Sequence, residues 1–119
     1  NLYVAICRLD GLDSTAEPTP AEVTGRGLDG SCPIAAEALS MFSAMLGTVA
    51  SDLALSLGAR GGVYVAGGIV PKLGEAFATS PFRRRFEDKG RFSGYLAAIP
   101  TFVITHELPA FIGLGELLE

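Results

Sequence analysis

Two short apolar segments constrain the fold of this chain more than any other feature. They read VYVA at residues 63–66 and TFVIT at residues 101–105, and a helix-like segment follows each of them. Both are apolar on both faces, which is typical of strands covered by helices on each side of a parallel sheet. The sequence therefore predicts an α/β fold with parallel strands. Because a sheet of only two strands is rarely stable by itself, we expect further strands outside this sequence.

Helical patterns fill most of the remaining sequence, and proline, glycine and small polar residues separate them. A cap is predicted at Thr19, because Pro20 stands at the first helical position after it. The predicted helices cover residues 2–9, 20–28 and 33–57, two or three short helices between 71 and 100 broken at Ser80–Pro81 and Lys89–Gly90, and residues 109–119.

The longest helical pattern runs from Pro33 to Leu57. Apolar side chains at three- and four-residue spacing predict one buried face, made of Ala38, Phe42, Met45, Val49 and Leu53. Another side carries mostly small polar residues, namely Glu37, Ser40, Gly47, Ser51 and Asp52, so we expect a long helix that is buried on most sides. A membrane span is the alternative, but Asp52 would cost about 2.5 to 3.5 kcal/mol near its middle. The pattern therefore favours a helix in a protein core over a membrane-spanning helix.

The charge balance and the cysteines exclude two classes of protein. The 13 acidic and 9 basic side chains give a net charge of -4, which disfavours binding to the phosphate backbone of nucleic acids. Cys7 and Cys32 lack a C-x-x-C spacing, and with a single histidine they are too few for a structural zinc site. We expect both cysteines to be free thiols in a reducing cytoplasm.

The apolar content is high for 119 residues, with a mean hydropathy of +0.39. A small domain has little polar surface with which to cover so many apolar residues, so we expect some apolar surface to face a partner. The chain also begins at Asn1 inside an apolar helical pattern, without a charged leader or a cleavage site. This favours a piece of a longer protein.

Gly67 and Gly68, which follow the first strand, are the candidate ligand site. In open α/β sheets, ligands bind beyond the carboxyl ends of the strands. Residues without a β-carbon also let a ring or a phosphate lie against the backbone. The alternative is a tight strand-to-helix turn that receives no ligand, and spacing alone favours that alternative. No G-x-x-x-x-G-K-[ST] phosphate loop occurs in the sequence.

A basic stretch at residues 83–92 could hold anions, with phenylalanines interleaved as stacking surfaces. Glu87 and Asp88 interrupt it, and the chain as a whole is acidic. We interpret it as a solvated helix face whose phenylalanines point inward. The basic residues are Arg83, Arg84, Arg85, Lys89 and Arg91.

Two other stretches resemble functional motifs only in part. His106 and Glu107 begin like the metalloprotease motif H-E-x-x-H, but Ala110 stands where the second histidine is required. We therefore expect His106 to be a hydrogen-bonded structural residue. The stretch DGLDST at residues 10–15 is interpreted as turn chemistry.

Four stretches together resemble one known family. NLYVAI, GGVYVAGGIVPKL, FRRRFEDKGRF and IPTFVITHELPAFIGLGELL look like the carboxyl-terminal part of the bacterial glucokinases, which phosphorylate glucose with ATP. The resemblance covers nearly all of the chain. It implies a ribonuclease-H-like, actin-like ATPase fold, in which residues 1–119 form the carboxyl-terminal portion of the large α/β domain and the amino-terminal domain is absent.

The resemblance also implies roles for particular residues. In such kinases the Gly-Gly pair after this strand contacts adenosine, so Gly67 and Gly68 would let ATP, with Mg as its counterion, approach the backbone. Ala66 and Ile69 would flank the nucleotide by position only. The family's catalytic aspartate and its glucose-binding side chains lie upstream of the matched part. We therefore expect no catalytic or metal-binding residue in this chain, and no activity from the chain alone.

The implied function of the whole protein is transfer of the ATP γ-phosphoryl group to the 6-hydroxyl of glucose in the cytoplasm. Its partners would be glucose and ATP, and the chain by itself is expected to self-associate. The alternative is a stand-alone interaction or regulatory domain derived from a sugar-kinase half-fold. A dinucleotide-binding module is a weaker hypothesis, because no G-x-G-x-x-G follows either predicted strand.

Overall fold

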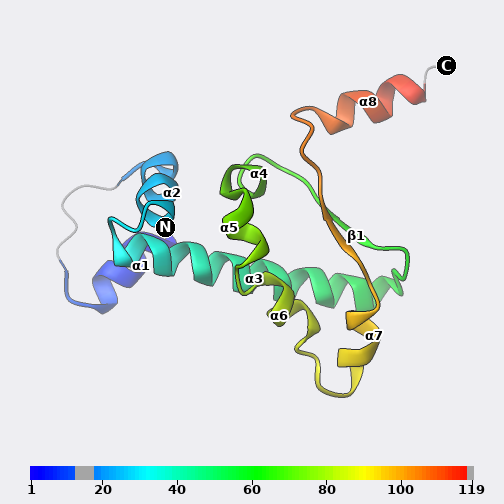
Figure 1. Cartoon of the computed structure of the whole chain (residues 1–119), viewed down its shortest axis with the longest axis horizontal. Coiled ribbons are helices and arrows are strands. Elements are labelled where there is room, and N and C mark those ends of the chain that lie inside the picture. The colour runs from blue at the N-terminus through cyan, green and yellow to red at the C-terminus, as the bar shows by residue number, and fades with distance from the viewer. Residues whose placement is uncertain (13–17, 118–119) are drawn as a thin grey trace.

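The computed structural model describes residues 1–12 and 18–117 of the chain, and Figure 1 shows their path. Helices predominate, and the two strands lie in the second half of the sequence. The elements in order are α1 (Leu2–Leu9), α2 (Pro20–Leu28), α3 (Pro33–Leu57), β1 (Val63–Val65), α4 (Val70–Leu73), α5 (Glu75–Ala78), α6 (Phe82–Glu87), the 3-10 helix η1 (Gly90–Phe92), α7 (Ser93–Ala97), β2 (Thr101–Val103) and α8 (Pro109–Glu116).

The two strands pair in parallel, as predicted. Tyr64 lies opposite Phe102, and Val65 lies opposite Val103. The pairing extends one residue beyond β2, where the amide of Ile104 donates to the carbonyl of Val65 at 2.9 Å. Because the strands run in the same direction, their carboxyl ends, and the loops that follow them, meet at one edge of the pair.

The prediction that both faces of the strands are covered is wrong. Val63 and Val65 pack against the core, whereas Tyr64 is 63% exposed. Its ring stacks on that of Phe102, with 5.0 Å between the ring centroids. The two aromatic rings thus cover each other on a face over which the described residues place no helix.

α2 begins with the predicted cap. The Thr19 hydroxyl accepts a hydrogen bond from the amide of Glu22 at 3.3 Å, and the Glu22 carboxylate accepts one from the amide of Thr19 at 2.8 Å. These reciprocal bonds satisfy two amides that a helix start leaves without a partner. The pKa of Glu22 lies below its usual value, chiefly because the carboxylate accepts from the Thr19 amide and then because it accepts from the Thr19 hydroxyl at 2.9 Å.

α3 has the predicted bounds but buries a different face. Ala38 is buried and Phe42 is partly buried, as predicted, whereas Met45, Val49 and Leu53 are 58%, 55% and 56% exposed. The buried residues are small: Ala35, Ala38, Ser43, Gly47, Ala50, Ser51 and Ala54. The prediction of a helix buried on most sides is therefore wrong in the part of the chain that the structure describes.

Close approach by α6 explains which face of α3 is buried. At Gly47 the backbone carbonyl of Phe82 lies so near that an added β-carbon would collide with it. Small side chains let the two helix backbones meet, and large ones would hold them apart. The packing of α6 in turn buries Phe82 and Phe86, which join Leu96 and Ile99 in the main apolar core.

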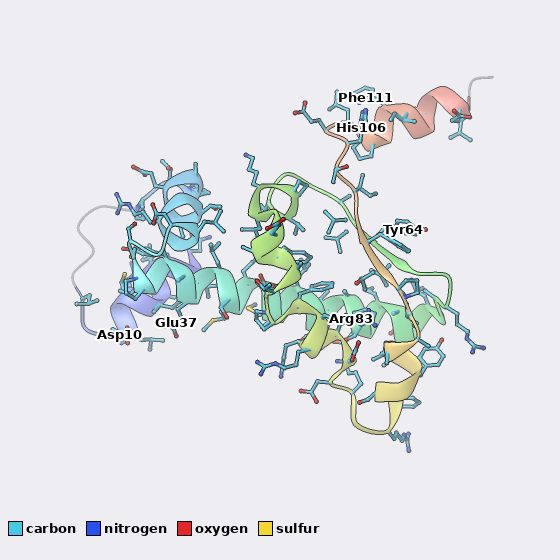
Figure 2. The ribbon with its side chains drawn as sticks, in the orientation of Figure 1. Asp10, Glu37, Tyr64, Arg83, His106 and Phe111 are labelled. Carbon is cyan, nitrogen blue, oxygen red and sulfur yellow. The ribbon has the colours of Figure 1, made fainter. Side chains whose placement is uncertain are left out.

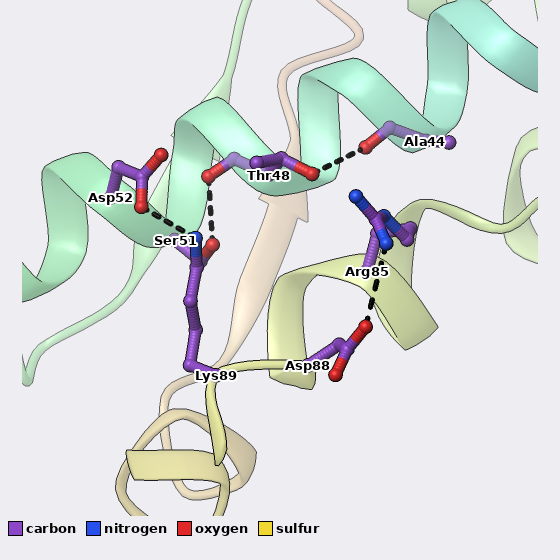
Figure 3. Close-up of polar contacts among 7 residues, drawn as sticks. All are labelled: Ala44, Thr48, Ser51, Asp52, Arg85, Asp88 and Lys89. Carbon is purple, nitrogen blue, oxygen red and sulfur yellow. Dashed lines mark hydrogen bonds and ion pairs between the residues drawn. The ribbon is translucent and has the colours of Figure 1, made fainter. Parts of the chain in front are cut away.

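One ion pair joins the same two helices, and Figure 3 shows it beside hydrogen bonds within each helix. Lys89, just after α6, pairs with Asp52 on α3, and within α3 the Ser51 hydroxyl donates to the carbonyl of Thr48 at 2.7 Å. The serine therefore makes its hydrogen bond within its own helix, so this face can be buried with its hydroxyl satisfied. The carboxylate of Asp52, whose charge disfavours a membrane-spanning helix, is thus paired with the ammonium of Lys89.

By length and composition, α3 could cross a membrane. Core helices of water-soluble proteins meet the same criteria, and α3 packs against α1, α2 and α6 along its length. Its ion pair with Lys89 and the packing of its small buried residues against other helices fit a core helix better than a lipid-exposed one.

The segment between Val70 and Ala97 contains more breaks than predicted. The predicted breaks near Ser80–Pro81 and Lys89–Gly90 occur, and a further one at Gly74 separates α4 from α5. Beyond β2 the chain leads to α8, which projects away from the remaining elements (Figure 1). Its apolar side chains Phe111, Ile112 and Leu114 are exposed.

Candidate functional site

A groove of about 450 Å³ lies at the carboxyl ends of the two strands. One wall comes from the turn between β1 and α4, and the other from the loop between β2 and α8. The lining residues are Gly67, Gly68, Pro71, Lys72, Thr105, His106, Glu107 and Pro109. The groove thus occupies the place where open parallel sheets bind ligands, and the two predicted glycines line it.

The glycine turn is shaped by its backbone. Gly67 has a φ of 118°, a conformation that residues with a β-carbon rarely adopt. Gly68 has no such strain, and a β-carbon there would have no described atom within 4 Å. The need for glycine at position 67 follows from the turn, whereas the structure itself gives no packing reason for glycine at position 68. Open space beside Gly68 is what a ligand lying against the backbone requires.

The groove is flanked by charged groups of both signs. Lys72 follows the glycine turn and Glu107 follows β2, and neither has an ion-pair partner among residues 1–12 and 18–117. An ammonium and a carboxylate with free hydrogen-bonding capacity suit a ligand that has both acceptor oxygens and hydroxyl groups. Among the described residues that line the groove, Glu107 supplies the one carboxylate.

The imidazole of His106 makes a hydrogen bond with the backbone two residues later. Its Nδ1 accepts from the backbone amide of Leu108 at 3.0 Å, which confirms the prediction of a hydrogen-bonded residue. Figure 2 shows His106 near Phe111, where the chain leaves β2 for α8. The structure places His106 in the groove as well, which the sequence interpretation did not anticipate.

A second hollow, of about 500 Å³, also borders the glycine turn. The start of α2 forms its far wall, while Gly68 and Lys72 line both hollows. The end of the glycine turn thus borders two hollows, and the start of α2 is the third element at the site. The residues of the second hollow are Thr19, Pro20, Ala21, Thr24, Gly68, Ile69 and Lys72.

The basic stretch 83–92 is in part the predicted solvated helix face, because Arg84 and Arg85 are exposed, whereas Arg83 is partly buried. Phe82 and Phe86 are buried, and Arg83 pairs with Glu87 at 2.6 Å. The guanidinium of Arg83 also donates to the carbonyls of Ile99 at 2.8 Å and Ala97 at 2.9 Å. Arg83 thereby fastens the end of α7 just before β2 begins. The prediction that the phenylalanines point inward is wrong at Phe92, which is exposed.

The remaining candidates contribute nothing to the groove. Cys7 and Cys32 are free thiols, as predicted, and a hydrogen bond to Cys7 is the main cause that raises the pKa of Tyr3. The stretch at residues 10–15 lies partly outside the described residues, and its described part is a turn at Asp10 and Gly11. Among the residues that the structure describes, no cluster of three or more acidic, histidine or cysteine side chains could hold a metal ion.

One G-x-G-x-x-G spacing does occur in the sequence, at residues 25–30. It spans the end of α2 and the turn after it, and it follows a helix rather than a strand. The dinucleotide fingerprint requires a strand before it and a helix after its first glycine. The spacing therefore carries no phosphate-binding function here.

Sequence reasoning missed Lys72, His106 and Glu107 as members of one site. A signal for them was present, because the carboxyl ends of paired parallel strands lie at the same edge. The residues a few positions after VYVA and after TFVIT had to meet there. The sequence does not show how far each loop extends in space, so it could not show which loop residues line the same groove.

Comparison with known proteins identifies the family. The sequence model of the glucokinase family matches residues 1–119. The chain belongs to the glucokinase family. This glucokinase-family chain is 60% identical over 118 residues to the glucokinase of Aromatoleum aromaticum and 59% identical over 118 residues to that of Paramagnetospirillum magneticum.

The matches cover nearly all of this chain but only part of each relative. They include 99% of the chain, 35% of the Aromatoleum protein and 36% of the Paramagnetospirillum protein. The chain thus spans about a third of the length of these curated relatives. A crystal structure of a glucokinase from an Antarctic psychrotroph superimposes with a TM-score of 0.79 over 90% of this chain and 33% of that one, at 33% identity.

Proposed function

We propose that residues 1–119 are the carboxyl-terminal portion of the large α/β domain of a glucokinase with a ribonuclease-H-like, actin-like ATPase fold. The complete enzyme transfers the γ-phosphoryl group of ATP to the 6-hydroxyl of glucose in the cytoplasm. Membership of the glucokinase family over the whole chain supports this activity. The share of about a third of each relative supports the assignment to one portion of the enzyme.

The role of this portion is to hold the adenosine of ATP at Gly67 and Gly68. The observation that carries this proposal is the open space beside Gly68, at the carboxyl edge of a parallel strand pair and bordered by two hollows. Adenosine offers a flat ring that can lie against a backbone without β-carbons. Lys72 and Glu107 supply a cation and a carboxylate at the edge of the same groove.

Bond making belongs to the rest of the enzyme. Phosphoryl transfer needs a carboxylate near the attacking hydroxyl and charge neutralisation at the phosphates, which magnesium bound to ATP supplies. The described residues of this chain offer no cluster that would hold that ion. The chain therefore orients the nucleotide, while the catalytic base and the glucose ligands lie elsewhere in the complete protein.

A second candidate function is that of a stand-alone interaction domain. The exposed apolar side chains of α3 and α8 favour it, because a protein partner would cover them. The two hypotheses differ in the sequence that precedes Asn1. A glycine-rich turn and strand-borne aspartates upstream support the kinase, and a native start at Asn1 supports the interaction domain.

Substitution of Gly68 by valine tests the nucleotide role. In the full-length kinase, Gly68→Val is expected to raise the KM for ATP about tenfold, a loss of about 1.4 kcal/mol of binding, because its side chain enters the groove. The KM for glucose stays unchanged. The isolated 119-residue chain, assayed in parallel, is expected to show no glucose phosphorylation above buffer.

Gly61→Val is the matched control. Gly61 precedes β1 at the opposite end of the strand, and a β-carbon there also meets no described atom within 4 Å. This variant should keep both KM values. A Gly68→Val enzyme whose KM for glucose rises while that for ATP stays constant contradicts the nucleotide role. A lower melting temperature with unchanged KM values supports the turn without a ligand.

A further inference from the structure

The two nitrogen atoms of His106 have different surroundings. Nδ1 accepts the hydrogen bond from the amide of Leu108, so the neutral imidazole carries its proton on Nε2. Among residues 1–12 and 18–117, no hydrogen-bond partner is present for that Nε2–H. The local bond thus fixes the tautomer and leaves one donor without a partner among the described residues, on a side chain that lines the groove.

His106 and the glycine turn lie on different walls of the groove. His106 belongs to the wall that follows β2, and Gly67 and Gly68 belong to the wall that follows β1. A ligand lying against the glycine backbone is therefore bounded by the imidazole across the groove. The glycines themselves have no side chain with which to orient such a ligand, so directional contacts depend on the other residues of the groove, and His106 is one of them.

We propose that His106 is a nucleoside-binding residue that donates a hydrogen bond from Nε2–H to an acceptor atom of the adenosine. This inference rests on the proposed function, because it assigns the nucleotide to the same groove. The bond from Leu108 orients the ring, and the bond from Nε2 holds the nucleoside against the glycine turn. His106 is then more than the structural residue that its sequence context suggests.

Two substitutions separate binding from local structure. The bond from Leu108 spans two residues, like the bond that asparagine makes in an Asx-turn, so His106→Asn keeps the turn but loses the distant donor. His106→Gln places an amide N–H at about the reach of Nε2, because its side chain is one methylene longer than that of asparagine. A nucleoside-binding role and a purely structural role therefore predict opposite orders for the two variants.

The experiment measures the KM for ATP, the KM for glucose, kcat and the melting temperature of both variants in the full-length kinase. We expect His106→Asn to raise the KM for ATP about three- to tenfold, the value of one neutral hydrogen bond, and His106→Gln to recover most of that loss. The KM for glucose and the melting temperature should stay at the wild-type values.

Each other outcome overturns the proposal. An Asn variant with the wild-type KM for ATP, or a Gln variant more impaired than the Asn variant, shows that His106 only shapes the turn. Equal increases in both KM values show a general disturbance of the domain. Gly68→Val, measured alongside, distinguishes the two proposals: if it raises the KM for ATP while His106→Asn does not, the groove binds nucleotide without His106. If neither variant changes that KM, the proposed adenosine-binding role of the groove fails as well.

Discussion

Arg83 shows how one side chain joins segments that are distant in sequence. It lies on α6, and its guanidinium donates to backbone carbonyls between Leu96 and Ile99, 13 to 16 residues later. Those carbonyls belong to the end of α7 and to the residues that lead into β2. A planar group with five donors can bind several carbonyls at once, which the ammonium of lysine cannot do with the same geometry.

We predict that Arg83→Lys lowers the free energy of unfolding by about 1 to 3 kcal/mol, because carbonyls near the core lose their donors. Urea unfolding measures this. Arg84→Lys is the control, since the Arg84 side chain is exposed and makes no hydrogen bond or ion pair with the described residues. Equal stability of the two variants would show that the carbonyls find other donors.

Glu22 makes the stability of α2 dependent on pH. Its hydrogen bonds with Thr19 form with the carboxylate, so the folded-state pKa lies below the usual value for glutamate. A group with a lowered folded pKa stabilises the protein fully above its unfolded pKa. That contribution is lost as the pH falls through the folded pKa.

We therefore expect wild type to be more stable than Glu22→Gln at about pH 7, and the difference to shrink toward about pH 3. Thermal unfolding across that range measures it. Glu37→Gln serves as the control, because the Glu37 side chain is exposed and makes no hydrogen bond or ion pair in the described part of the chain. A difference between Glu22→Gln and wild type that grows on acidification would contradict the role of the ionised cap.

At the scale of elements, the crossing of α3 and α6 organises the core. Gly47 provides the point of closest approach, and the buried alanines and serines on the same side of α3 extend it. The phenylalanines of α6 then enter the core beside Leu96 and Ile99. The position of β2 depends on this crossing, because Arg83 on α6 holds the residues that precede the strand.

We predict that Gly47→Ala destabilises the domain by about 1 to 3 kcal/mol, since the new methyl group would force α6 outward. Gly94→Ala is the matched control. Gly94 is helical too, but a β-carbon there meets no described atom within 4 Å, so this variant should be neutral or more stable by up to about 1 kcal/mol. Similar losses in both variants would contradict the close crossing.

At the scale of the whole molecule, the chain exposes more surface than a compact protein of its mass. Its accessible surface is 8113 Å², against about 6100 Å² expected for a folded monomer of 12.4 kDa. Its radius of gyration is 16.7 Å, against about 13.5 Å for a compact chain of this length. The excess is comparable with the area that a stable protein interface buries.

Part of that excess is an apolar stripe on α3. Its members recur every fourth residue and are exposed, and their large side chains include no charge: Met41, Met45, Val49, Leu53 and Leu57. Helices with such a ridge pack well against one another at a crossing angle of about -50°. We therefore expect the isolated 119-residue chain to self-associate through this stripe.

The double variant Val49→Lys, Leu53→Lys should shift the isolated chain toward the monomer, because charges would be buried in the contact. Light scattering across a dilution series measures the shift. Leu9→Lys, which removes an exposed leucine outside the stripe, is expected to leave association unchanged. A wild-type chain that stays monomeric at micromolar concentration would contradict the expectation.

The sequence by itself determined the elements of this protein and much of the candidate site. The α2 cap and the bounds of α3 depend on local patterns, and the structure confirms them. The parallel pairing was also predictable, because two strands separated by helices pair in this way. Gly67 and Gly68 stood out for the same reason, since a strand end followed by glycines is a local feature.

Only the tertiary structure decided which surfaces are buried and which side chains share the groove. Periodicity identified Met45, Val49 and Leu53 as an apolar face, but burial depends on which element approaches the helix, and α6 approaches over Gly47 instead. His106 and Glu107 joined the glycine turn because β2 pairs beside β1, a contact between residues nearly 40 positions apart. Hydrophobicity is a property of each residue, whereas burial and proximity are properties of the packed chain.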